Sequence, residues 1–128
     1  MSDANKKLIQ DGFDAFGAQD MERLSELFAA DVKWHTRGNN PLSGDHDGLE
    51  SVLALMAQAG QGADFDFKTH SILADDEHAV ALMTTTATRG DKSYSGQTVF
   101  VYHVGGGKIS EVWTFNEDQA SVDAFWAD

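Results

Sequence analysis

The spacing of hydrophobic residues changes along the chain, and this change constrains the fold more than any other feature. In the first half, hydrophobic residues such as Leu8, Phe13 and Phe16 recur at the spacing of an α-helix. From Ala63 the period falls to two, and over residues 64–69 polar and hydrophobic residues alternate. Helices followed by antiparallel strands predict an α+β domain in which the helices cover one face of a sheet.

Turn and capping residues divide this pattern into elements. Asp20 and Asp47 are expected to cap the second and third helices, and Asn116 is expected to cap a short final helix. The expected elements are helices at residues 3–17, 21–28 and 47–60, an early strand at 32–36, an antiparallel meander at 64–69, 78–89, 93–104 and 108–115, and the final helix.

Composition excludes several classes of function. The 128 residues suit one domain, spanning 1–128, and a net charge of −12 disfavours binding to nucleic acid or anionic membranes. The chain has no cysteine, which excludes disulfides and thiolate chemistry. No hydrophobic run is long enough to span a membrane and no signal peptide is recognisable, so a cytoplasmic protein is expected.

The segment at residues 29–49 has the features of a pocket wall and rim. Trp34 and His35 are adjacent on a short strand, which opens into an irregular loop rich in Gly, Asn, Pro and Ser. Such a loop at the end of a strand is a common place for a binding site in a small domain. The sequence therefore predicts a pocket here.

Several short pieces follow one another in a recognisable order, at residues 13–16, 20–22, 27–35, 41–44, 73–76 and 107–113. In this order and spacing the chain resembles the nuclear transport factor 2-like superfamily, and in particular its polyketide-cyclase-like (SnoaL-like) branch. The resemblance covers nearly the whole chain. It implies a cone-shaped α+β barrel, in which a curved, mostly antiparallel sheet wraps around the N-terminal helices and a short C-terminal helix follows. The open end of the cone would hold an apolar pocket.

The family includes polyketide cyclases, ketosteroid isomerase, limonene epoxide hydrolase and non-catalytic binding domains, so the fold leaves the function open. Thr36 occupies the place of the isomerase's strand aspartate, and Gly12 falls near the place of its tyrosine. Phe115 corresponds to the epoxide hydrolase's catalytic aspartate. These departures disfavour each of the named reactions.

Three residues are candidates for proton-transfer chemistry. His35 beside the pocket could act as an acid or base near neutral pH, although strand alternation favours the outer face of the sheet or a dimer contact. Glu111 has the parity of Trp113 and could enter the cone with a raised pKa, or lie in solvent at the end of its strand. Tyr102 could orient a carbonyl group of the substrate.

Aromatic residues at inward-facing positions are expected to contact an apolar ligand or to form ordinary core. No cofactor and no metal is expected, because the Asp-His-Asp at residues 45–47 has poor spacing for one metal site. The predicted ligand-binding residues are Phe16, Trp34, Phe67, Phe100, Trp113 and Phe115.

The outward-facing residues Val99, Val101 and His103 give the sheet a second, largely apolar face. Such a face normally needs a cover, so a homodimer that packs sheet to sheet through the outer face is expected.

Three functions follow from this pattern. The first is a cofactor-independent isomerase or cyclase-type enzyme that moves a proton on a small apolar substrate. The second is a non-catalytic ligand-binding or accessory domain, and the third is a dimeric scaffold whose cone is filled with core side chains.

Overall fold

The structure, a computed structural model, describes residues 2–127 and contains a six-stranded mixed sheet with four helices. The strand order is β2-β1-β6-β5-β4-β3, and within it only β1 and β6 run parallel. The elements in chain order are α1 (Asp3–Gly17), α2 (Met21–Leu27), β1 (Phe28–Thr36), β2 (Gly44–Asp47), α3 (Leu49–Gly62), β3 (Asp64–Ala74), β4 (His78–Arg89), β5 (Lys92–Gly105), β6 (Lys108–Asn116) and α4 (Gln119–Trp126).

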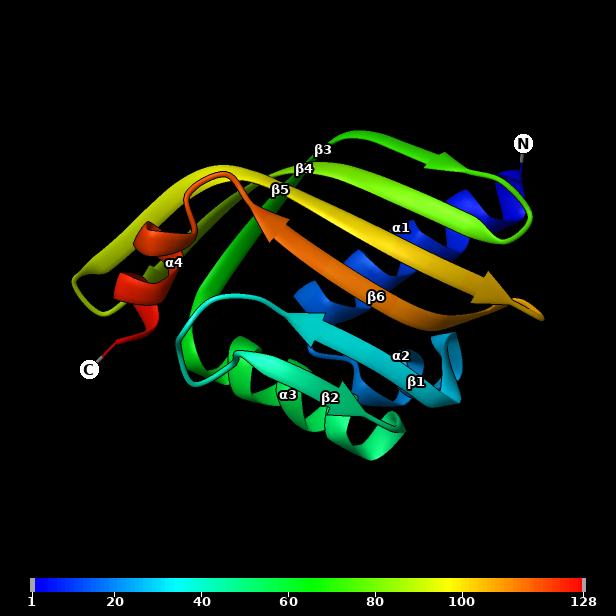
Figure 1. Ribbon diagram of the computed structural model, residues 1–128, viewed down its shortest axis with the longest axis horizontal. Helices are drawn as coiled ribbons and strands as arrows, with labels where there is room; N and C mark the ends of the chain where they lie inside the picture. Colours follow the sequence, from blue (N-terminus) through cyan, green and yellow to red (C-terminus); the bar gives the residue numbers. More distant parts are fainter. Residues whose placement is uncertain (1, 128) are drawn as a thin grey trace.

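The long strands β3 to β6 form an antiparallel meander that bends across the molecule, with α1 lying behind it (Figure 1). The short helix α4 lies at the end where β4 turns into β5, and α3 packs beside β1 and β2. The predicted α+β cone is therefore confirmed. Among the described residues, no helix is both long enough and apolar enough to cross a membrane.

The core lies between the helices and one face of the sheet, called here the inner face. Ile9 of α1, Leu24 of α2, Val52 of α3 and Val112 of β6 are almost completely buried in it. Each such side chain stabilises the fold by about 1.5–3 kcal/mol relative to exposure in water. The other face of the sheet is called the outer face, and none of the described helices packs on it.

The helix caps differ in part from the sequence prediction. The carboxylate of Asp20 accepts a hydrogen bond from the Arg23 backbone N–H, which confirms the predicted cap of α2. The prediction for α4 is wrong, because Asp118 caps it in place of Asn116.

The prediction that Asp47 caps α3 is also wrong. Asp47 lies in β2, a strand missing from the sequence prediction, where it pairs with Lys33 of β1. The capping position falls on Gly48, which has a positive φ of 90° and whose N–H donates to the Val32 carbonyl oxygen. Because Asp47 pairs with β1, it is not available to cap α3.

A β-bulge in β6 decides which side chains face the core. His103 of β5 pairs with Glu111 and Val104 pairs with Ile109, which leaves Ser110 as the extra residue. An extra residue reverses the alternation of the strand beyond it. Val112 and Thr114 therefore face the core, whereas Trp113 and Phe115 face outward.

Candidate functional site

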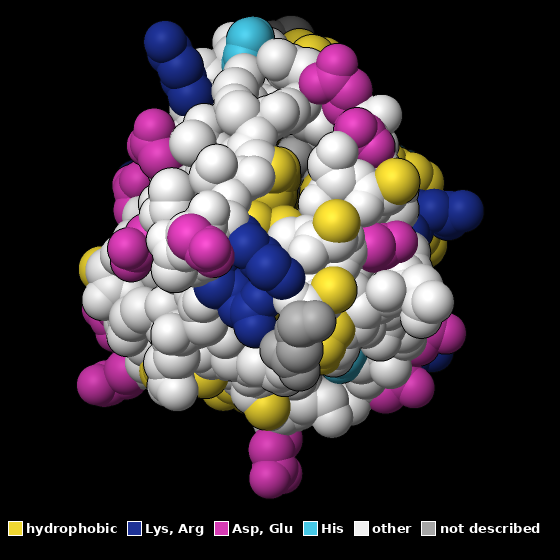
Figure 2. All heavy atoms as spheres, turned by 90° about the vertical axis from the view of Figure 1, so that its left-hand side faces the viewer, with side chains coloured by type: hydrophobic (Ala, Val, Ile, Leu, Met, Phe, Trp, Pro, Cys, Tyr) yellow, Lys and Arg dark blue, Asp and Glu magenta, His cyan; other side chains and the backbone are white. Residues whose placement is uncertain are grey.

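A cavity of about 160 Å³ lies between the helices and the inner face of the sheet. Side chains from α1, β1, α3 and the four strands of the meander line it, and Val122 and Trp126 of α4 contribute to its lining. Viewed from the end where α4 lies, the surface is hollowed, and hydrophobic side chains are visible within the hollow (Figure 2).

One side of the cavity is aromatic. The ring of Phe13 lies 5.2 Å from that of Phe67 and 5.1 Å from that of Phe100, measured between centroids. Phe16 lies 5.6 Å from Phe65. These tilted and edge-on contacts are the preferred geometry of aromatic pairs. Of the predicted ligand-binding residues, the structure places four around the cavity: Phe16, Trp34, Phe67 and Phe100.

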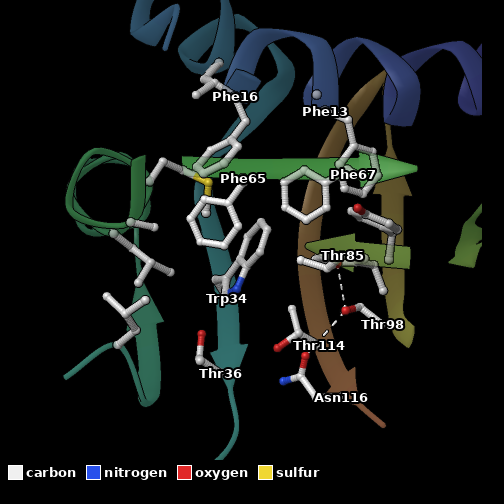
Figure 3. A pocket seen from close by; sticks show the side chains of 18 of the residues that line it. Phe13, Phe16, Trp34, Thr36, Phe65, Phe67, Thr85, Thr98, Thr114 and Asn116 are labelled. Atoms are coloured by element: carbon white, nitrogen blue, oxygen red, sulfur yellow. Dashed lines mark hydrogen bonds between the residues drawn. The ribbon is translucent and has the colours of Figure 1, made fainter. Parts of the chain in front are cut away.

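The other side of the cavity is polar but uncharged. Figure 3 shows the phenylalanines on one side, the indole of Trp34 between, and a group of hydroxyl and amide side chains opposite. Two hydrogen bonds link this group, from Thr85 to Thr98 at 2.9 Å and from Thr98 to Asn116 at 3.4 Å. The polar group, called here the polar end, consists of Thr36, Thr85, Thr98, Thr114 and Asn116.

The described lining residues include no carboxylate, imidazole, amine or guanidinium group. Their titratable groups are the hydroxyls of Tyr94 and Tyr102. Burial raises the pKa of Tyr94 to about 12, and it raises the pKa of the more deeply buried Tyr102 well above its usual range. Both tyrosines therefore stay protonated near neutral pH and can donate a hydrogen bond.

The prediction that Trp113 and Phe115 line the cavity is wrong. The bulge at Ser110 turns both side chains to the outer face, where Phe115 is 40% exposed beneath the guanidinium of Arg37. Trp113 stacks on His35 with 5.3 Å between ring centroids and meets His103 edge-on at 4.8 Å.

His35 also lies on the outer face, in a cluster with two carboxylates. Its Nδ1 is 2.7 Å from an Asp45 oxygen and its Nε2 is 2.6 Å from a Glu111 oxygen. Hydrogen bonds to Asp45 and Glu111 raise the pKa of His35 above its ordinary value, against a smaller opposing effect of burial. Both ring nitrogens can donate at once only when the imidazole is protonated.

The three predicted catalytic residues do not form one site. The structure brings His35 and Glu111 together on the outer face. Glu111 therefore does not enter the cone, and His35 faces outward, as strand alternation favoured. Tyr102 lines the cavity on the opposite side of the sheet. No group of three or more metal-binding side chains is arranged around a common point within residues 2–127.

Apart from Thr36, sequence reasoning missed the polar end of the cavity. Thr85 and Thr98 have inward parity on their strands, yet threonine is equally common on the exposed face of a sheet. Simple alternation placed Thr114 outward, and the bulge in β6 reverses this. Phe65 could have been found, because it shares the parity of Phe67 in the alternating run at the start of β3.

The comparisons with known proteins agree with this fold. A family model described as a SnoaL-like domain matches residues 9–112. An uncharacterised protein of Mycobacterium tuberculosis is 28% identical over 98% of both chains. The structure of Bal32a, from a soil-derived mobile gene cassette, has a TM-score of 0.91 and 28% identity over 97% of both chains. An NTF2-like protein from Burkholderia xenovorans has a TM-score of 0.89 and 21% identity, covering 99% of this chain and 98% of that one.

Proposed function

The chain belongs to the SnoaL-like domain family, and from that premise we propose that its cavity binds a flat, uncharged, largely apolar small molecule. We propose further that it does so without acid–base catalysis. One observation carries both proposals: the cavity lining combines aromatic rings with hydroxyl and amide groups and includes no ionised side chain among the described residues.

The size and polarity of the cavity support this ligand class. A dry apolar cavity of about 150 Å³ suffices for a benzene-sized ligand, and the cavity here is about 160 Å³. A charged ligand would lose its hydration without finding an opposite charge, at a cost of several kcal/mol. Aromatic rings on one side and a few hydroxyls on the other are typical of small-molecule sites.

Proton-transfer catalysis, the alternative, finds less support. A general base must lie within hydrogen-bond reach of the proton that it removes. His35 and Glu111 lie behind the sheet and bond to one another. Tyr102 reaches the cavity, but its raised pKa makes it a hydrogen-bond donor and a poor base at neutral pH.

A cavity-filling substitution tests the proposal. Gly12 of α1 lines the cavity, and a Cβ atom added to it meets no atom within 4 Å. We expect Gly12→Leu to abolish binding of a neutral aromatic probe such as indole, measured by isothermal titration calorimetry, while the protein stays folded.

Gly17→Leu is the matched control, because Gly17 lies on the same helix with equal room for a Cβ but does not line the cavity. We expect indole to bind this variant as it binds the original chain. If no binding occurs to the original chain, or if Gly12→Leu binds as well as Gly17→Leu, the proposed function is wrong.

We also propose that two copies of the chain pack through the outer face of the sheet. Two adjacent cross-strand rows of apolar residues run across β4, β5 and β6 and form an outer stripe. Polar rows flank it, with His103 and Glu111 on one side and Thr84 and Gln97 on the other. The outer stripe consists of Val80, Val101 and Trp113 in one row and Leu82, Val99 and Phe115 in the other.

The two rows are suited to a two-fold interface, in which one patch meets a copy of itself. An axis along the stripe, between the rows, would lay the Trp113 row of one copy over the Phe115 row of the other. The Trp113 row continues to His35 and Asp45, while Arg37 lies over Phe115. The same axis would therefore bring Asp45 toward Arg37 of the second copy, with complementary charge.

Sedimentation velocity at micromolar concentration tests this packing. We expect a mass of twice the chain, and we expect Val101→Lys to yield a monomer because it places a charge in the stripe. Thr86→Lys, on the outer face of β4 but beyond the stripe, should leave the dimer intact. A monomeric original chain, or equal effects of both lysines, would exclude this interface.

A further inference from the structure

A chain of hydrogen bonds runs from the surface near α4 into the cavity. Gln119 Nε2 donates to Asp123 Oδ1 at 3.0 Å, and Asn116 Nδ2 donates to Gln119 Oε1 at 3.0 Å. Asn116 Oδ1 accepts from the Thr98 hydroxyl at 3.4 Å, and Thr98 contacts Thr85 at 2.9 Å. This series of hydrogen bonds thus ends at Thr85 of the polar end (Figure 3).

Asp123 sets the direction of the first link. Hydrogen bonds from the Asn40 side chain, the Gln119 side chain and the Asn39 backbone hold the pKa of Asp123 below its usual range. An ionised carboxylate only accepts hydrogen bonds, so Gln119 must turn its amide nitrogen toward it. The Gln119 amide oxygen then faces Asn116.

Each later link follows from the one before. Because Gln119 offers an oxygen, Asn116 must donate with Nδ2, and its own oxygen turns to Thr98. The Thr98 hydroxyl has one hydrogen and gives it to Asn116. Thr98 can then only accept in its contact with Thr85, so the Thr85 hydroxyl is the donor.

Thr85 is left with acceptor capacity at the cavity. Its single hydroxyl hydrogen is directed to Thr98, and no residue in the described part of the chain donates to its oxygen. The hydroxyl oxygen of the neighbouring Thr114 is also left as an acceptor, since its hydrogen is donated to the His35 carbonyl oxygen at 3.4 Å. Thr85 and Thr114 therefore present two hydroxyl oxygens as hydrogen-bond acceptors within the polar end.

We propose that the ligand of this cavity carries a hydrogen-bond donor, such as a hydroxyl or a ring N–H, and donates it to Thr85. This inference rests on the proposed binding function and specifies its ligand class. Gln119 and Asp123 lie outside the cavity and act as positioning residues, because they fix which way the hydrogen bonds point.

The local backbone is built to hold these positioning residues in place. Gly38, with φ of +94°, lies so close to them that a Cβ atom there would overlap with Gln119 Nε2 and Asp123 Oδ1. Asn39 and Asn40 follow it and both donate to Asp123. The loop after β1 is thus fastened to the start of the hydrogen-bond chain.

Indole and benzofuran form a suitable probe pair, because they share one shape and differ in whether the ring heteroatom donates or accepts. The measured quantity is the ratio of the benzofuran Kd to the indole Kd, by isothermal titration calorimetry. Comparing this ratio between variants cancels the different transfer of the two probes from water. A buried acceptor that gains a donor changes affinity by about fivefold to tenfold.

Thr85→Val removes the acceptor while keeping the shape of the side chain. We expect the ratio to fall by about fivefold to tenfold in this variant. Thr85→Ser keeps the hydroxyl and should keep the ratio. An unchanged ratio in Thr85→Val would overturn the inference.

A sharper test reverses the direction of these hydrogen bonds by a substitution outside the cavity. In Gln119→Lys the ammonium pairs with Asp123 and can only donate to Asn116, which turns the Asn116 amide over and makes Thr85 a donor into the cavity. We expect the ratio to fall below that of Thr85→Val, so that benzofuran is favoured. In the control Gln119→Glu, one oxygen of the new carboxyl still accepts from Asn116, and a proton shared with Asp123 replaces the lost amide donor, so the ratio should be retained.

The outcomes separate this inference from the proposed function. If neither probe binds the original chain, the proposed function fails. If both probes bind and the ratio is the same in the original chain, Thr85→Val and Gln119→Lys, binding stands and the donor preference is wrong. If Thr85→Val lowers the ratio but Gln119→Lys does not, the positioning role of Gln119 and Asp123 is wrong.

Discussion

The inner face of β1 and β6 is uncharged and their outer face is charged, although the residues of the two faces alternate along the same short strands. On the inner face, Trp34 and Thr114 border an uncharged cavity. On the outer face, their sequence neighbours His35 and Trp113 stack together, and His35 bridges two carboxylates. Adjacent residues on one strand therefore serve separate purposes.

Solvation explains the separation. The side chain of His35 is 24% exposed and that of Asp45 is 72% exposed, so water shares the cost of their charges. If His35, Asp45 and Glu111 lay inside the cavity, they would lose their hydration, which costs several kcal/mol for each ion. A neutral interior is the condition under which the weak polarity of threonine hydroxyls can select a ligand.

The largest expected effect comes from breaking the neutrality of the inner face. Thr85 is 2% exposed, whereas the next residue, Thr86, is exposed on the outer face. We expect Thr85→Asp to lower the free energy of unfolding by about 3–5 kcal/mol at pH 7, because it buries a charge without a partner. Urea unfolding measures the loss.

Thr86→Asp is the matched control and should cost less than about 1 kcal/mol. The buried aspartate of Thr85→Asp would have a raised pKa, so its stability should recover as the pH falls below that pKa and the carboxyl becomes neutral. Equal losses at the two positions, or no recovery in acid, would contradict the contrast between the faces.

A medium effect is expected at the loop that joins β1 to β2. Gly38 and Gly44 both have positive φ, but only Gly38 lacks room for a Cβ. We expect Gly38→Ala to cost about 2–4 kcal/mol, from backbone strain and from the clash with Gln119 and Asp123, and Gly44→Ala to cost about 1 kcal/mol from strain alone. Similar melting temperatures of the two variants would show that the close approach of Gly38 does not matter.

The smallest expected effect belongs to the outer face and depends on pH. The raised pKa of His35 means that the folded state binds its proton more tightly than the unfolded state, whose value is about 6.5. This stabilisation is present in full below about pH 6.5 and is lost as the pH rises through the folded-state pKa. We expect it to be at most about 1 kcal/mol, since the site is partly exposed.

His35→Gln should remove this dependence, seen as a smaller change in urea midpoint between acid and alkaline buffers than in the original chain. His70→Gln is the control, because within residues 2–127 His70 has a hydrogen bond to the Thr84 hydroxyl and no carboxylate partner. The cluster would have no electrostatic role if both variants kept the pH dependence of the original chain.

Alternation identified inward residues wherever a strand is regular. Phe100 and Tyr102 of β5 were predicted to face inward, and both are buried there. The same reasoning failed on β6, because Ser110 inserts one unpaired residue and exchanges the faces of Trp113 and Phe115. A bulge depends on the pairing of two strands, and the residues of one strand do not reveal it.

Capping shows a similar division. Asp20 caps α2 and lies in no strand, so the local sequence sufficed to predict it. Asp47 has the same capacity to cap a helix, but it lies in β2 because its backbone pairs with β1. Local propensity decides such a residue only when no partner strand is near.

The sequence by itself determined the α+β class, the order of the long elements and the aromatic side of the cavity. Those features depend on hydrophobic period and turn residues, which act over a few neighbours in the chain. The tertiary structure alone decided the outward turn of Glu111 and Trp113, the His35 cluster and the polar end of the cavity. Each of these joins residues from strands far apart in the chain, whose register is fixed only when the whole sheet forms.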